Sequence, residues 1–196
     1  MANDRFAPLT AALAAALVLL AMPLAAGEAP AAEPATEEVC VLDTTLGTMV
    51  FRFFDDKAPR TTAQIKRLVK EGFYDGKPFY RVVAGHVIQA GDGGANDQPT
   101  VPGEFGAYPH VVGAVGLARD ADPDSGSTEI YICLAPRHYL DGSYAVFGLL
   151  IEGFDVLERI GQVEVEERFE GRVAFHKPKV PVIIERAYLE RRPLPP

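Results

Sequence analysis

The run FYRVVAGHVIQAGD, residues 79–92, places a single arginine, Arg81, among apolar neighbours and follows it eight residues later with Gln89. A guanidinium group is a permanent cation with five N–H donors, and an amide offers both donors and an acceptor. In so apolar a run, Arg81 is either half of a buried ion pair or a donor aimed at a bound molecule. On its own it is most simply an arginine whose stem lies along a strand with its head in water. The surrounding elements decide between these interpretations.

Length and charge limit the classes of function. The chain has 196 residues, of which 48% are hydrophobic and 23% charged, and this composition indicates one globular domain with a single core. Acidic residues outnumber basic ones by 27 to 19, so no cationic surface is available for a phosphate backbone. We therefore expect no nucleic-acid partner, and we expect a monomer.

Neither the cysteines nor the histidines indicate a metal site. Cys40 and Cys133 each lie in an apolar, strand-like run and form no C-x-x-C pair, which predicts two buried thiols, with a disulfide as the alternative. His110, His138 and His176 share no spacing typical of metal ligands. We expect no metal and no organic cofactor.

The N-terminus reads as an export signal. Residues 1–27 hold a long Ala/Leu-rich run that ends in small residues, which is typical of a secretory signal peptide. An uncleaved inner-membrane anchor is the alternative, because the run is about long enough to span a bilayer. Residues 28–38, rich in Ala, Pro and Glu, predict a disordered linker. The folded domain, expected over residues 39–191 with a tail at 192–196, would then lie in the periplasm or otherwise outside the cytoplasm.

The domain has the pattern of a small β-barrel. Residues 39–54 predict a β-hairpin around a turn at 44–47, and residues 59–71 predict one helix that Gly72 ends. Six further short apolar runs, separated by Gly and Pro, bring the expected strands to about eight, the number that closes a small barrel. A second helix is expected over residues 153–160. The aromatic side chains expected in the core are Phe51, Phe53, Phe79 and Phe147.

Four motifs in order resemble the cyclophilin-type peptidyl-prolyl cis-trans isomerases. They are LDTTLGTMVFRFFDDKAPRTTAQIKRLVKEGFYDG, FYRVVAGHVIQAGD, GAVGLARDADPDSGSTEIYICLA and YLDGSYAVFGLLIEG, and together they span most of residues 39–190. The resemblance implies a mainly β fold, a closed eight-stranded antiparallel β-barrel capped by two α-helices. It also implies an active groove on the outer face of the sheet.

The resemblance assigns roles to individual positions. Arg81 matches the family's catalytic arginine and Gln89 its backbone-binding glutamine. Positions that match groove residues are Ala118 beside a neighbouring pocket, Tyr131 on the floor of the proline pocket and Leu140 on its wall. Positions that depart from the usual residue are His86 and Val87 for Phe and Met, Glu129 for Gln, Tyr139 for Trp, and Tyr144 for His. With Tyr131, Leu140 and Val87, Ile130 is a further candidate for the proline pocket.

The implied reaction suits these residue types. Rotation about an Xaa-Pro bond faces a barrier of about 18–20 kcal/mol because the amide is conjugated. As the bond twists, the proline nitrogen gains a lone pair, and a fixed guanidinium can bond it more strongly in the twisted state than in either ground state. Arg81 is the candidate donor, Gln89 would hold the substrate backbone, and proline-containing polypeptides are the expected partners.

Glu129 raises an alternative. An ionised carboxylate only accepts hydrogen bonds, so it cannot supply the donor of the family's glutamine. If Glu129 lies beside Arg81, the two charges would pair and draw the guanidinium away from the proline. The alternative function is therefore a proline-binding chaperone or scaffold that uses the same groove with low activity.

Overall fold

The computed structural model describes residues 35–92, 98–170 and 173–194. The predicted signal peptide or anchor lies outside the described residues, as does most of the predicted linker. Strand β1 already begins at Thr36, inside that linker, and β10 runs to Pro193, inside the predicted tail. Among the described residues, no helix is long and apolar enough to cross a membrane.

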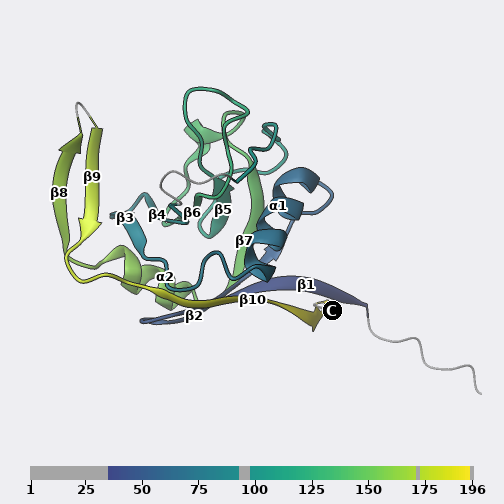
Figure 1. Cartoon of the computed structure of the whole chain (residues 1–196), viewed down its shortest axis with the longest axis horizontal. Helices are drawn as coiled ribbons and strands as arrows, with labels where there is room; N and C mark the ends of the chain where they lie inside the picture. Colours follow the sequence, from purple (N-terminus) through teal and green to yellow (C-terminus); the bar gives the residue numbers. More distant parts are fainter. Residues whose placement is uncertain (1–34, 93–97, 171–172, 195–196) are drawn as a thin grey trace, which may run out of the picture. The chain divides into compact units, whose positions relative to one another are not determined.

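One antiparallel sheet of eight strands forms the body of the fold, in the order β10-β1-β2-β7-β5-β6-β4-β3 (Figure 1). Its strands are β1 Thr36–Thr44, β2 Gly47–Phe53, β3 Phe79–Val83, β4 Val87–Ala90, β5 Ala114–Leu117, β6 Ile130–Cys133, β7 Val146–Glu152 and β10 Ile184–Pro193. The helices are α1 Pro59–Lys70 and α2 Phe154–Gly161, and a short 3-10 helix, η1, spans His138–Leu140. The mainly β fold with two helices is therefore confirmed.

Local sequence signals account for the first elements. In the turn between β1 and β2, the Thr44 hydroxyl donates to the Gly47 carbonyl at 2.6 Å and accepts from the Leu46 N–H at 3.2 Å. Gly47 has a φ of +124°, a conformation that favours glycine. Helix α1 has Pro59 at its start, where a missing N–H costs no hydrogen bond. The predicted hairpin and first helix both form.

The core fills the interior of the curled sheet. The four aromatic residues expected there are all buried, with exposed fractions of 8% or less: Phe51, Phe53, Phe79 and Phe147. Ile65 and Leu68 of α1 are fully buried in the same cluster. Cys40 and Cys133 are buried free thiols, as predicted, and burial raises the pKa of Cys133 to about 12.

The sheet curls without closing completely, which corrects the expectation of a closed barrel. Within the described ranges, its two edge strands, β3 and β10, are joined only where Pro78 and Ile183 form an isolated bridge. The Phe79 N–H donates to the Val182 carbonyl, and the Ile184 N–H donates to the Lys77 carbonyl, each at 2.8 Å. These two bonds flank the Pro78–Ile183 pair, and β3 and β10 otherwise stand at opposite ends of the strand order among the described strands.

A second, two-stranded sheet was not predicted. Strands β8 (Val165–Glu170) and β9 (Val173–Pro178) pair antiparallel, and β9 packs beside β3 (Figure 1). The sequence VEVEERFE carries five charged residues among eight, a density typical of a solvated segment, so its alternation was missed. This hairpin is an addition to the eight-stranded sheet.

Candidate active site

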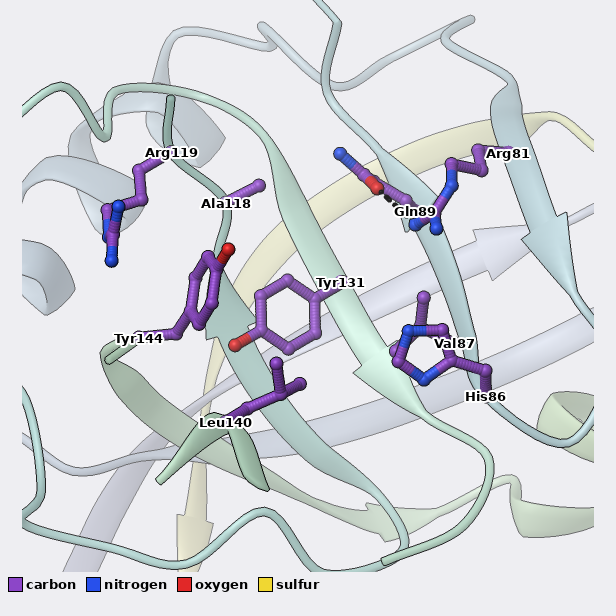
Figure 2. A pocket seen from close by; sticks show the side chains of 9 residues that line it. All are labelled: Arg81, His86, Val87, Gln89, Ala118, Arg119, Tyr131, Leu140 and Tyr144. Carbon is purple, nitrogen blue, oxygen red and sulfur yellow. Dashed lines mark hydrogen bonds between the residues drawn. The ribbon is translucent and has the colours of Figure 1, made fainter. Parts of the chain in front are cut away.

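An open cleft of about 210 Å³ lies on the outer face of the sheet. Its lining side chains, drawn in Figure 2, are Arg81, His86, Val87, Gln89, Ala118, Arg119, Tyr131, Leu140 and Tyr144. Eight of these nine were expected at the groove from the sequence, and Arg119 was not. The structure therefore brings together residues that are up to 63 positions apart, from Arg81 to Tyr144.

The pleat of the strands decides which side chains face the cleft. Gln89 of β4 pairs with Tyr131 of β6, and Arg81 of β3 pairs with Gln89, so these three side chains share one face. Ile130 points to the opposite face and is 1% exposed within the interior core. The expectation that Ile130 contributes to the proline pocket is therefore wrong, because neighbouring residues of a strand point to opposite faces.

Arg81 is held at the cleft by a neutral partner. Its Nη1 donates to Oε1 of Gln89 at 3.0 Å, and the side chain is half-buried. Among the residues that the structure describes, no carboxylate forms an ion pair with Arg81. The interpretation of Arg81 as half of a buried structural ion pair is therefore not supported.

Glu129 contacts Gln89 and not Arg81. Its Oε2 accepts from Gln89 Nε2 at 2.8 Å and from the Tyr80 hydroxyl at 2.5 Å, and the same Nε2 also lies 2.5 Å from the Tyr80 oxygen. Burial, followed by the hydrogen bond to Glu129, raises the pKa of Tyr80 and keeps its hydroxyl a donor. The conditional expectation that Glu129 pairs with Arg81 is therefore not met. Instead, Glu129 fixes the orientation of the Gln89 amide, with the carbonyl oxygen toward Arg81.

A buried chain of hydrogen bonds supports the floor of the cleft. His110 is fully buried, and its Nδ1 lies 2.7 Å from Oδ1 of Asp141 while its Nε2 lies 2.8 Å from the Tyr131 hydroxyl. Since a carboxylate only accepts, His110 donates from Nδ1, and a neutral ring with its proton there accepts the Tyr131 O–H at Nε2. This hydrogen bond from His110 is the main reason that the pKa of Asp141 is lowered to about 2. A Cβ at Gly116 would lie 2.2 Å from the Tyr131 ring, so glycine makes room for this floor.

One end of the cleft holds a neutral imidazole between cations. Nδ1 of His86 accepts from Nε of Arg137 at 2.8 Å, which leaves the ring proton on Nε2. Burial first, and then the charges of Arg137 and Arg81, lower the pKa of His86. Tyr139 lies at the rim, 69% exposed, with its hydroxyl 3.5 Å from Nε2 of His86.

Arg119 closes the other end of the cleft. Its guanidinium lies over the rings of Tyr144 and Phe105, at 4.7 and 5.5 Å from their centroids. Nε and Nη2 both donate to the Ser143 carbonyl, at 3.0 and 2.8 Å. A sequence signal existed, since Arg119 follows Ala118 directly, but only the fold shows that it reaches the cleft.

Comparisons with known proteins agree with this geometry. Residues 39–189 match the family model "Cyclophilin type peptidyl-prolyl cis-trans isomerase/CLD". A Brucella abortus protein named "Probable peptidyl-prolyl cis-trans isomerase" is 35% identical over 168 residues, which cover 77% of this chain and 84% of that protein. A mouse protein named "Peptidyl-prolyl cis-trans isomerase-like 1" is 30% identical over 141 residues, covering 65% and 81%.

Solved structures are similar in fold. A Cryptosporidium parvum cyclophilin-type isomerase, crystallised in the presence of the dipeptide Ala-Pro, superposes with a TM-score of 0.70 at 22% identity, covering 78% of this chain and 98% of that one. A cyclophilin from Hirschia baltica gives a TM-score of 0.63 at 24% identity, covering 76% and 72%. At these identities the likeness shows the fold alone.

Proposed function

Since the chain belongs to the family of cyclophilin-type peptidyl-prolyl cis-trans isomerases, we propose that it accelerates Xaa-Pro rotation in exported polypeptides through a hydrogen bond from Arg81. The main observation in support of this mechanism is that Arg81 is half-buried at the cleft and hydrogen-bonded to the neutral side chain of Gln89. Its charge is not neutralised by a carboxylate within the described residues, so it remains available to a substrate.

The rate enhancement comes from the difference between the planar and the twisted amide. In the planar amide the proline nitrogen is conjugated and is a poor acceptor, whereas in the twisted amide it has a lone pair. Arg81 stabilises the second state more than the first, and that difference lowers the barrier. No covalent step is required.

The apolar part of the cleft suits a proline ring. Val87 and Tyr131 are 3% and 5% exposed and pack in one cluster on this outer face, and Leu140 completes the lining. Burying a ring of this size contributes about 2 kcal/mol. With the ring held there, rotation moves the chain on the other side of the bond past Arg81.

A kinetic comparison of Arg81→Ala with the wild type tests this mechanism. Removing a donor used mainly in the transition state should lower kcat/KM on the order of 100-fold, with an unchanged circular dichroism spectrum. The assay couples isomerisation of an Xaa-Pro peptide to proteolysis of the trans form. An unchanged rate would show that Arg81 does not act on the bond.

A specific contact favours a second candidate, the slow proline-binding chaperone. Nε2 of Gln89 already donates within the protein, toward Glu129 and Tyr80, and its Oε1 already accepts from Arg81, so Gln89 has fewer groups left for the substrate backbone. Fewer substrate contacts would slow turnover while leaving the cleft able to bind. The wild-type assay separates the two, because a binder gives no acceleration at micromolar protein.

The proposal of export rests on the sequence of residues 1–27. Fractionation of a Gram-negative host that expresses the full chain tests it. We expect a shortened product in the periplasmic fraction. Full-length protein in the membrane fraction would instead support the anchor, and soluble cytoplasmic protein would contradict export.

A further inference from the structure

Three arginines surround the cleft, and in the part of the chain that the structure describes each is bonded only to neutral acceptors. Arg81 bonds the amide oxygen of Gln89, Arg119 bonds backbone carbonyls, and Arg137 bonds the His86 ring and the Pro136 carbonyl. Across the described ranges, none of the three forms an ion pair. Arginines elsewhere do pair with carboxylates: Arg52, Arg67, Arg159 and Arg192.

Two carboxylates hydrogen-bond side chains that line or support the cleft. Glu129 accepts from Tyr80 and Gln89, and Asp141 accepts from His110 and is within 3.1 Å of His138. Neither forms an ion pair with a cleft arginine. Among the described residues the cleft is lined by Arg81 and Arg119 and by no carboxylate, so its lining is positively charged in a chain whose net charge is −8.

These cations stand at both ends of the apolar floor. Figure 2 shows Arg119 on one side of the Tyr131 ring, with Arg81 and His86 on the other side. Arg137 hydrogen-bonds His86 and adds a second positive charge at that end of the cleft. After burial, this charge is the next largest cause of the lowered pKa of His86. An extended peptide advances about 3.3–3.6 Å per residue, so the residues before and after a proline bound over Tyr131 would extend toward these two ends.

Arg119 and Arg137 are suited to anions in different ways. Arg119 is held in place by the Ser143 carbonyl and by two aromatic rings, so it is a fixed cation. Arg137 is half-buried, and within the described part of the chain its hydrogen bonds, to His86 and Pro136, use two of five N–H donors. The Nε2–H of His86 adds a neutral donor at that end.

We propose that the cleft selects peptides that carry carboxylates two residues before and after the proline, with Arg119 and Arg137 as the specificity-determining residues. This preference rests on the proposed isomerase function and adds a substrate class to it. Each arginine should raise kcat/KM for an acidic peptide over a neutral one by about twofold to fivefold, which is the range for partly exposed ion pairs. Neutral substrates remain substrates, because the pocket for the ring does not depend on these charges.

Three peptides test the preference: acetyl-Glu-Ala-Pro-Ala-Glu-amide and its analogues with Gln or Lys in place of both glutamates. The blocked termini matter, because a free carboxylate would imitate the feature under test. Exchange NMR measures cis-trans rates for each peptide without a protease. We expect kcat/KM to fall in the order Glu, Gln, Lys, with a Glu-to-Lys ratio on the order of tenfold that shrinks in 0.5 M salt.

Variants assign the preference to the two arginines. Arg119→Gln and Arg137→Gln should each lower the Glu-to-Lys ratio about twofold to fivefold, and Arg119→Lys, which keeps the charge, should largely retain it. Arg186→Gln is the matched control, since Arg186 is exposed on β10 and stacks on Tyr188. It removes the same charge away from the cleft and should leave the ratio unchanged.

Failure of this inference is distinguishable from failure of the isomerase function. Equal rates for the three peptides, or a ratio that Arg186→Gln lowers as much as Arg119→Gln and Arg137→Gln do, would overturn the charge preference alone. No acceleration of any peptide would overturn the isomerase function and the preference together. Ratios are compared within each variant, so a change in its overall activity does not affect the result.

Discussion

Replacing Glu129 by glutamine should make the enzyme faster. The change is nearly isosteric, and the glutamine carbonyl can still accept from Gln89 Nε2 and the Tyr80 hydroxyl, which now meet the carboxylate at 2.8 and 2.5 Å. The substitution removes one negative charge and adds an N–H donor that can face the substrate backbone. Both effects favour the transition state. Once the carboxylate is removed, Arg81 acts on the proline nitrogen without its competing charge, and the added N–H can bond the substrate backbone.

The structure sets the size of this effect. Arg81 and Glu129 are linked through Gln89 by hydrogen bonds of 3.0 and 2.8 Å, and the amide between them adds roughly 2 Å, so the charges lie at most about 8 Å apart. Their attraction at about 8 Å is about 0.5 kcal/mol in bulk water and about 2 kcal/mol at an effective dielectric constant of 20. Only the part of this attraction that differs between the planar and the twisted amide of the substrate changes the rate. We therefore expect kcat/KM to rise by about twofold to tenfold.

The assay compares both proteins with one Xaa-Pro peptide at one pH. Glu158→Gln serves as a control, because Glu158 is exposed on α2 and hydrogen-bonds Gln162. Equal rates for the two proteins would mean that Glu129 has no role. A slower Glu129→Gln would mean that Gln89 needs the carboxylate to be held in place, and it would refute the reasoning.

Two further predictions concern the rim and the floor. Cyclosporin-like inhibitors should bind weakly, because Tyr139 stands where the family's tryptophan offers an indole N–H, and its phenol is 69% exposed; nanomolar inhibition in a titration would contradict this. Asp141→Asn should flatten the acid dependence of stability. The pKa of Asp141 is lowered in the folded state to about 2 by its hydrogen bond from His110, so its contribution is present above the unfolded value near 3.8 and is lost as the pH falls toward 2. Thermal unfolding followed by circular dichroism should show that the melting temperature falls further for the wild type than for Asp141→Asn as the pH is lowered over that window. Equal falls in melting temperature would contradict a stabilising role for the Asp141 carboxylate.

Local patterns predicted most of the fold correctly. The turn before Gly47 and the helix from Pro59 depend on residues close in sequence, and the alternation that buries Phe51 and Phe53 has the fixed period of a strand. The same period contradicts one expectation, since Ile130 directly precedes Tyr131 and the two cannot share a face. The β8–β9 hairpin was missed because its charged residues hid the alternation.

The sequence by itself determined the family, the strands of the eight-stranded sheet and the positions of Arg81 and Gln89, because motif order and side-chain period are properties of the chain read along its length. Only the tertiary structure decided which group each polar side chain meets. Glu129 bonds Gln89, 40 residues away, and His110 bonds Tyr131, 21 residues away. Such partners depend on how strands are paired and how far each side chain reaches, and hydrogen bonds form only within about 3 Å. For the same reason the positive cleft of an acidic protein became visible only in three dimensions.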